Sequence, residues 1–247
     1  MKPIVFFTIV DDNYFYSAGT HILINSFKKY HPDIPLVVYR QDMIDKIFTK
    51  KKVNFYNAKP TFAKLLADEY ELVVNIDCDT VITGRLTEVI DGKYDVGGAW
   101  NFNSYENASF ENIDEKMYVQ AGLVGSRDKK FWDIWEKANK DWEKYVRKEN
   151  DVLNLVWYND PYVSKLNKVI YDKDNNYLGC KSLGREAEMY IFADKLMLDG
   201  QEVKAYHHAK GDVRPKLVFE TMGFTPQVTK WLHETAYQGI SFKVEAI

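Results

Sequence analysis

Apolar runs alternate along the chain with stretches of helical periodicity. Residues 4–10 form a continuous apolar run typical of a buried strand. Residues 17–30 follow with Leu23, Phe27 and Tyr30 at steps of four and three, the spacing of one helical face. The same reading predicts strands at 36–39, 53–56 and 72–76, with a helix at 61–67. The alternation favours an α/β fold with a mostly parallel central sheet and helices on both faces.

The second half of the chain has a less regular pattern. We expect strands at 96–100, 117–125 and 203–206 and helices at 129–146 and 187–198. The first of these helices shows the clearest apolar stripe, which consists of Phe131, Trp135, Ala138, Trp142 and Tyr145. Since no repeat, linker or low-complexity tract divides the sequence, residues 1–247 are expected to form a single domain.

Charge and cysteine content narrow the classes of function. The chain has 33 Lys and Arg against 36 Asp and Glu, so it carries no overall field that would attract nucleic acid. The first apolar run is too short to span a bilayer, and residues 230–247 lack a basic run, so we expect no strong membrane anchor. With only two cysteines, a disulfide framework is not expected, and a reducing cytoplasm is the simpler setting.

The sharpest chemical feature is Asp77-Cys78-Asp79, which follows the apolar residues 72–76. Strand alternation would place both carboxylates on one face, at the end of the sheet where ligands collect in open α/β folds. Two adjacent carboxylates repel unless a cation lies between them, and hard oxygen ligands suit Mg²⁺ or Mn²⁺. Asp-x-Asp pairs also occur as solvated turns, but the position directly after a buried strand favours a metal site that holds a diphosphate.

A second cluster, residues 207–216, combines two histidines, a glycine and three cations. An imidazole from it could be a further metal ligand, Gly211 would let the backbone approach an anion, and Arg214 could neutralise a departing diphosphate. The alternative is a basic surface turn, and His207 fits that alternative.

Five sequence blocks, taken in order, resemble glycosyltransferase family eight, whose members are retaining, metal-dependent enzymes of the GT-A fold. The blocks are Val10-Asp11-Asp12-Asn13-Tyr14, Asp77-Cys78-Asp79, Gln120-Ala121-Gly122, Glu149-Asn150-Asp151-Val152-Leu153-Asn154 and His208-x-x-Gly211-x-x-Arg214-Pro215. The resemblance implies a GT-A fold and transfer of a hexosyl sugar from a UDP-sugar to a hydroxyl group of a glycan or glycoconjugate.

The same resemblance implies a role for each block. Asp77, Asp79 and His208 would hold Mn²⁺ or Mg²⁺ against the diphosphate, which makes UDP a better leaving group. The remaining residues fall into three groups: Asp11, Asn13 and Tyr14 at the nucleoside, Gln120, Glu149, Asn150 and Asp151 at the sugar and the reaction centre, and Gly211 and Arg214 over the diphosphate.

The chain departs from the family pattern mainly at the sugar. Asn150, Glu149 and Gln120 stand where the family has Gln, Asp and Asn, and each change alters the reach of the side chain by one methylene. Hydroxyl recognition depends on such reach, so the donor sugar stays open. An amide at position 150 is a poor covalent nucleophile, which favours retention with attack and departure on one face of the sugar.

Other functions remain as alternatives. A sugar-nucleotide pyrophosphorylase would need a glycine-rich basic loop where residues 11–14 stand, and a dinucleotide oxidoreductase would need Gly-x-Gly-x-x-Gly after a strand. A catalytically inactive protein that binds a nucleotide sugar or carbohydrate with the same fold is the main competitor. The two acids and the basic cluster argue against it, because a protein that has lost turnover would be expected to lose some of them.

Overall fold

The structure is a computed structural model. It describes residues 1–10, 18–47, 55–100, 118–171, 180–181, 185–207, 219 and 222–236. Within this part of the chain, no helix is long and apolar enough to cross a membrane.

The centre of the molecule is a six-stranded sheet with the order β2-β1-β3-β6-β5-β7. Neighbouring strands run parallel except at β6, which is antiparallel to both β3 and β5. The sheet is therefore mostly parallel, as the sequence predicts. Its strands are β1 (Lys2–Ile9), β2 (Leu36–Tyr39), β3 (Tyr70–Ile76), β5 (Val96–Trp100), β6 (Val119–Ser126) and β7 (Lys168–Ile170).

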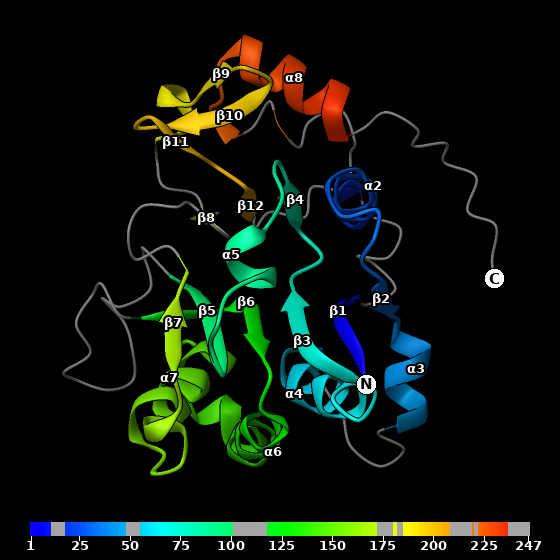
Figure 1. The fold of residues 1–247 in the computed structure, drawn as a ribbon, viewed down its shortest axis with the longest axis vertical. Helices are drawn as coiled ribbons and strands as arrows, with labels where there is room; N and C mark the ends of the chain where they lie inside the picture. Colours follow the sequence, from blue (N-terminus) through cyan, green and yellow to red (C-terminus); the bar gives the residue numbers. More distant parts are fainter. Residues whose placement is uncertain are drawn as a thin grey trace.

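Helices cover both faces of this sheet (Figure 1). The alternation of side chains along β1 supplies both cores, because Val5 and Phe7 pack into one apolar cluster and Phe6 into another. The first cluster is closed by α3 (Gln41–Ile47), α4 (Phe55–Leu66), α6 (Lys129–Ala138) and α7 (Glu149–Asn159). The second is closed by α2 (Ala18–Tyr30) and α5 (Thr87–Ile90).

A second layer lies beyond the end of β3, in the upper part of Figure 1. In its first sheet β12 pairs antiparallel with β4 and parallel with β8. A separate three-stranded sheet has the order β11-β10-β9 and packs against α8. The elements of this layer are β4 (Thr80–Ile82), β8 (Cys180–Lys181), β9 (Tyr190–Phe192), β10 (Lys195–Leu198), β11 (Gln201–Glu202), β12 (Ala205–His207) and α8 (Pro226–Ala236). Short 3-10 segments are η3 (Asn139–Lys144), η4 (Val163–Lys165) and η5 (Glu186–Glu188).

The predicted helix at 187–198 is wrong, because this segment forms the hairpin of β9 and β10. Ala193 and Asp194 make the turn with φ of 49° and 60°. The Asp194 carboxylate accepts a hydrogen bond from the Trp231 indole of α8 at 2.7 Å, a contact that no local pattern shows. In the hairpin Leu196 and Leu198 are buried and alternate with more exposed neighbours, as in a strand with one face toward a core.

Two further boundaries differ from prediction. The segment expected as a strand at 53–56 is already helical at residues 55 and 56, where α4 begins, while 53 and 54 lie outside the described residues. The helix expected over 129–146 ends at Ala138, and η3 continues the chain to Lys144. Phe131, Trp135 and Trp142 of the predicted stripe are buried although the helix type changes before Trp142, whereas Ala138 is exposed where α6 ends.

Candidate active site

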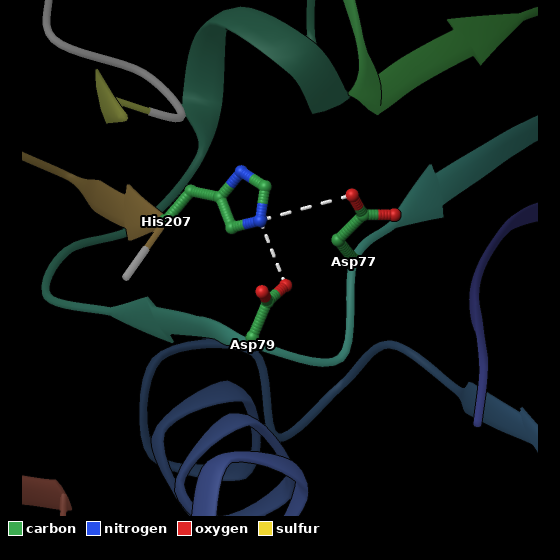
Figure 2. Close-up of side chains that lie close together, drawn as sticks. All are labelled: Asp77, Asp79 and His207. Atoms are coloured by element: carbon green, nitrogen blue, oxygen red, sulfur yellow. Dashed lines mark ion pairs between the residues drawn. The ribbon is translucent and has the colours of Figure 1, made fainter. Parts of the chain in front are cut away.

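Two carboxylates and one imidazole meet at the carboxyl end of β3 (Figure 2). Asp77 follows the last residue of β3, and its N–H donates to the Gly122 carbonyl of β6 at 2.8 Å. Asp79 directly precedes β4, and the β4–β12 pairing places His207 opposite Thr80. His207 Nε2 lies 2.7 Å from Asp79 Oδ1 and 3.8 Å from Asp77 Oδ2. Strand pairing thus joins residues that are far apart in sequence.

The chemistry of these donors fits a divalent metal ion. One ligand atom from each of Asp77, Asp79 and His207 can be chosen so that all lie within 4.8 Å of one another. Two hard oxygen donors and one imidazole nitrogen suit Mn²⁺, and Mg²⁺ favours the carboxylates. All three side chains are half-buried or buried, which limits competition from water.

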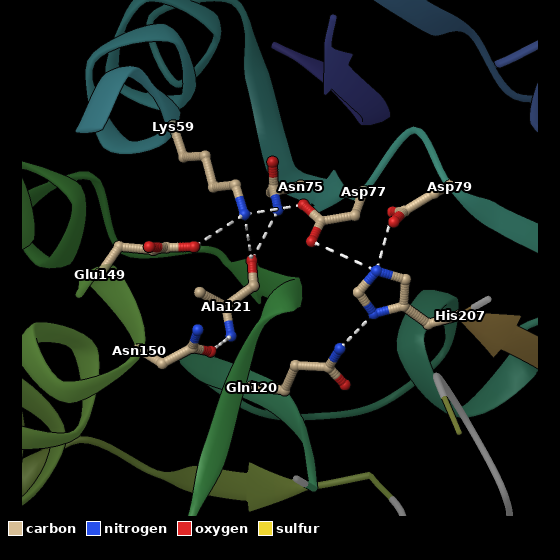
Figure 3. Close-up of polar contacts among 9 residues, drawn as sticks. All are labelled: Lys59, Asn75, Asp77, Asp79, Gln120, Ala121, Glu149, Asn150 and His207. Carbon is tan, nitrogen blue, oxygen red and sulfur yellow. Dashed lines mark hydrogen bonds and ion pairs between the residues drawn. The ribbon is translucent and has the colours of Figure 1, made fainter. Parts of the chain in front are cut away.

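A buried lysine completes the charge balance around Asp77 (Figure 3). Lys59 of α4 is 3% exposed, and its Nζ lies 2.7 Å from Asp77 Oδ1 and 3.8 Å from Glu149 Oε1. Burial alone lowers the pKa of Lys59, but the two carboxylates outweigh it and raise the pKa above the ordinary lysine value. Lys59 therefore stays charged and forms ion pairs with both Asp77 and Glu149.

Glu149 occupies the first turn of α7 and is buried. Burial raises the pKa of its carboxyl group, the Lys59 ammonium opposes that effect, and the charge of Asp77 adds to it. A buried carboxyl with a raised pKa beside an acid pair is typical of functional sites.

The pairing of β5 with β6 is interrupted beside the site. Gly98 pairs with Val124, but the next residue, Ala99, pairs with Gln120. The displaced backbone of Ala121 is satisfied by side chains instead: its N–H donates to Asn150 Oδ1 at 2.9 Å, and its carbonyl accepts from Asn75 Nδ2 at 2.9 Å and Lys59 Nζ at 3.4 Å (Figure 3). Such irregularities in a sheet often aim side chains into active sites.

Gln120 and Gly122 flank this irregular position. Gln120 Nε2 contacts His207 Nδ1 at 2.5 Å. A Cβ atom on Gly122 would lie 2.8 Å from Asp77 Oδ2 and 2.9 Å from Gln120 Nε2, closer than real contacts allow. Any larger residue here would therefore require the Asp77 carboxylate or the Gln120 amide to move.

The structure brings together a part of the residue set predicted from sequence. Asp77, Asp79, Gln120, Glu149 and Asn150 lie in one connected network of polar contacts. Asp151 is fully buried in another set of contacts, in which its carboxylate oxygens accept from the Tyr118 hydroxyl at 2.6 Å and the Arg147 N–H at 2.9 Å. The predictions for Asp11, Asn13, Tyr14, His208, Gly211 and Arg214 fall outside the described residues.

Sequence reasoning missed three contributors to the site. The pairing of β12 with β4 places His207 beside the acids and not in a surface turn. The available signal was a histidine directly after the predicted strand 203–206. No sequence pattern pointed to Lys59. It lies just before Pro60 in the part of α4 that precedes the predicted helix at 61–67. Asn75 showed only as a polar residue inside an apolar strand, and such a residue often meets a polar partner.

Comparison with known proteins gives a match at the level of structure. No protein-family model and no curated protein sequence matches the chain. Among solved structures, the bifunctional glycosyltransferase WbbM superposes with a TM-score of 0.58 at 15% identity over 96% of this chain, which spans 52% of WbbM. The galactosyltransferase LgtC, solved with donor and acceptor sugar analogues, superposes with a TM-score of 0.51 at 16% identity, over 92% of this chain and 99% of LgtC. The chain has the GT-A fold of these glycosyltransferases.

Proposed function

We propose that the protein is a glycosyltransferase that moves a hexosyl sugar from a UDP-sugar to a hydroxyl group of a glycan or glycoconjugate. The observation that carries the proposal is the cluster of Asp77, Asp79 and His207 at the carboxyl end of β3 in a GT-A fold. In open α/β sheets this edge is where ligands bind, and a carboxylate-bound divalent ion is suited to a diphosphate.

Asp77, Asp79 and His207 would hold Mn²⁺ or Mg²⁺ in this proposal. The sequence resemblance assigns the imidazole to His208, and the geometry supports its neighbour His207. When bound, the ion would supply Lewis-acid stabilisation of the negative charge on the departing diphosphate. Lys59 would keep the Asp77 carboxylate oriented and its charge balanced through their 2.7 Å ion pair.

The remaining roles rest on the sequence resemblance. Asp11, Asn13 and Tyr14 would hold the nucleoside, and Gly211 and Arg214 would close over the diphosphate. A nucleotide-sugar donor and a glycan acceptor are proposed by analogy with glycosyltransferases of this fold, of which LgtC was solved with donor and acceptor sugar analogues. A cytoplasmic setting is part of the proposal and rests on the low cysteine content.

At the sugar, the sequence resemblance assigns catalytic roles to Glu149, Asn150 and Asp151. Because Asp151 is buried against Tyr118 and the Arg147 N–H, we propose that it acts by holding the first turn of α7, which carries Glu149 and Asn150. Asn150 Oδ1 is engaged by the Ala121 N–H, which leaves the amide a fixed polar group and makes it a poor covalent nucleophile. We therefore favour retention of configuration with attack and departure on the same face of the donor sugar.

Hydrolysis of a panel of UDP-sugars without an acceptor tests the proposal. The native protein is assayed for UDP release with Mn²⁺ and with EDTA, beside Asp79→Ala. We expect metal-dependent release from one donor and a loss of at least about 100-fold in the variant, because one of two carboxylate ligands is removed. His207→Ala and His208→Ala form a matched pair that decides which imidazole acts, and we expect the greater loss at position 207.

Two results would count against the proposal. Metal-dependent binding of UDP without turnover of any donor, with or without sugar acceptors, would favour the inactive nucleotide-sugar binding protein. The absence of both binding and turnover would mean that the fold serves another function.

A further inference from the structure

The side chain of Gln120 contacts His207 on the side of the ring that faces away from Asp77 and Asp79 (Figure 3). Gln120 is 3% exposed, and its Nε2 lies 2.5 Å from His207 Nδ1, while His207 Nε2 faces Asp79 Oδ1 at 2.7 Å. Gln120 Oε1 is buried and has no hydrogen-bond partner among the described residues. An amide in this position has one oriented contact and one unused acceptor.

The end of the Gln120 amide that faces Nδ1 determines which of the two neutral tautomers His207 adopts. With the amide nitrogen toward Nδ1, the amide donates, so the ring proton sits on Nε2 and is directed at Asp79. Metal ligation through Nε2 needs the opposite tautomer, with the proton on Nδ1 and an acceptor beside it. Rotation of the Gln120 amide by half a turn about the Cγ–Cδ bond brings Oε1 next to His207 Nδ1 and supplies that acceptor.

The surroundings of Gln120 keep its amide within reach of His207. Its backbone is fixed by pairing with Ala99 at the irregular step between β5 and β6. Gly122 leaves open the space that a Cβ would fill 2.9 Å from the amide nitrogen. An asparagine would be one methylene shorter and would draw the amide back from the imidazole.

We propose that Gln120 is a positioning residue that selects the metal-binding tautomer of His207, and not a ligand of the donor sugar. The proposal rests on the proposed function, because it assumes that His207 binds the ion. Residues that hydrogen-bond to the second nitrogen of a metal-bound histidine fix its orientation, and their loss weakens metal affinity by about 10- to 100-fold.

The test is Mn²⁺ affinity at fixed pH, measured from the electron paramagnetic resonance signal of the free ion in the absence of nucleotide. We expect Gln120→Leu to weaken Mn²⁺ binding by about 10- to 100-fold, and Gln120→Asn to weaken it as well. Gln120→Glu is expected to bind Mn²⁺ at least as tightly as the native protein, because a carboxylate is a permanent acceptor for Nδ1–H. This rescue separates tautomer selection from a role in packing.

Asn139→Leu is the matched control, since Asn139 is another buried amide with no hydrogen-bond partner for its side-chain atoms among the described residues. It is expected to leave Mn²⁺ affinity unchanged. Thermal melts confirm that each variant is folded, and Gln120→Asn and Gln120→Glu carry the comparison if Gln120→Leu does not fold.

Three outcomes would overturn the proposal. Native-like Mn²⁺ affinity in Gln120→Leu and Gln120→Asn, with weaker binding of the UDP-sugar, would make Gln120 a sugar contact. Equal weakening in the Glu and Leu variants would mean that the amide acts only by packing. A native protein that binds no Mn²⁺, or binds it equally after Asp79→Ala, would remove the proposed metal site itself, and that result is distinct from the other two.

Discussion

At the scale of single residues, His31 links the end of α2 to the start of α5. Its ring is buried, it stacks on Phe27 with ring centroids 4.7 Å apart, and its Nε2 accepts a hydrogen bond from the Leu86 N–H at 3.0 Å. Burial, with a smaller contribution from Arg85, lowers the pKa of His31 to about 4. The folded protein therefore holds this ring neutral under conditions where the unfolded chain protonates it.

This lowered pKa makes stability depend on pH. Because the folded pKa of about 4 lies below the ordinary histidine pKa of 6.5, the contribution is complete above pH 6.5 and is lost as the pH falls toward 4. Between pH 7 and pH 5 we expect His31 to remove about 2 kcal/mol from the free energy of unfolding. Urea unfolding at the two pH values measures this loss.

His31→Gln is expected to flatten the pH dependence, because glutamine keeps an acceptor but does not titrate. His21→Gln is the control: the pKa of His21 is also lowered by burial, but the ring is only half-buried, so the effect is expected to be smaller. An unchanged pH dependence in His31→Gln would contradict the assignment.

The sequence predicts the acids of the candidate site more readily than their partners. Asp77 and Asp79 are recognisable because they follow an apolar strand, and this signal is local. Lys59 and His207 reach the same point only through the packing of α4 and the register of β12 against β4. Since both depend on contacts between segments far apart in the chain, a periodicity analysis cannot find them.

At the scale of elements, α7 holds Val119, the first residue of β6, through side-chain hydrogen bonds, in addition to the pairing of β6 with β5. Asn154 Oδ1 accepts from the Val119 N–H at 2.8 Å, and Asn154 Nδ2 donates to the Val119 carbonyl at 2.8 Å. Tyr118 donates to Asp151 next to this pair. The first turns of α7 therefore position the strand that carries Gln120.

Removal of this amide is expected to destabilise the fold. Asn154→Leu leaves a buried N–H and a buried carbonyl of Val119 without partners, and we expect a loss of about 2–4 kcal/mol in the free energy of unfolding. Chemical denaturation measures it. Asn159→Leu, at the exposed end of the same helix, is expected to change stability by less than about 0.5 kcal/mol. Similar losses in both variants would contradict the role given to Asn154.

Local pattern predicts some elements of the fold and fails at others for a physical reason. The strands β1, β2, β3 and β5 and the helix α2 follow from apolar runs and helical spacing. The failures at 187–198 and 53–56 lie where tertiary contacts decide the backbone: the Trp231–Asp194 hydrogen bond at the hairpin turn and the Lys59 ion pairs in α4 just before Pro60. Propensity is a weak guide where such contacts act.

At the scale of the whole molecule, the central sheet and the second layer share two elements. In α2, Leu23 and Phe27 pack against the central sheet, while Ile22 packs into the core of the second layer. In β4, Ile82 packs against the central sheet and Val81 packs into the core of the second layer. Neither layer can lose its core without exposing part of the other.

We therefore expect the protein to unfold in one cooperative transition, which also tests the sequence prediction of a single domain. Trp231 belongs to the core of the second layer, whereas Trp132, Trp135 and Trp157 belong to the core beside the central sheet. In Trp231→Phe, tryptophan fluorescence reports mainly the central sheet. We expect the urea unfolding curve measured by this fluorescence to coincide with the curve measured by far-ultraviolet circular dichroism of the same variant. Two separated midpoints would show that the layers unfold independently.

The ion pair between Lys59 and Asp77 has a practical consequence for handling the protein. Lys59 places a positive charge beside Asp77, so the repulsion between Asp77 and Asp79 is reduced even without a bound metal ion. A chelator can then serve as a reversible switch: protein purified in EDTA is expected to keep its fold, to be stored without metal, and to be reloaded with a chosen divalent ion before each assay.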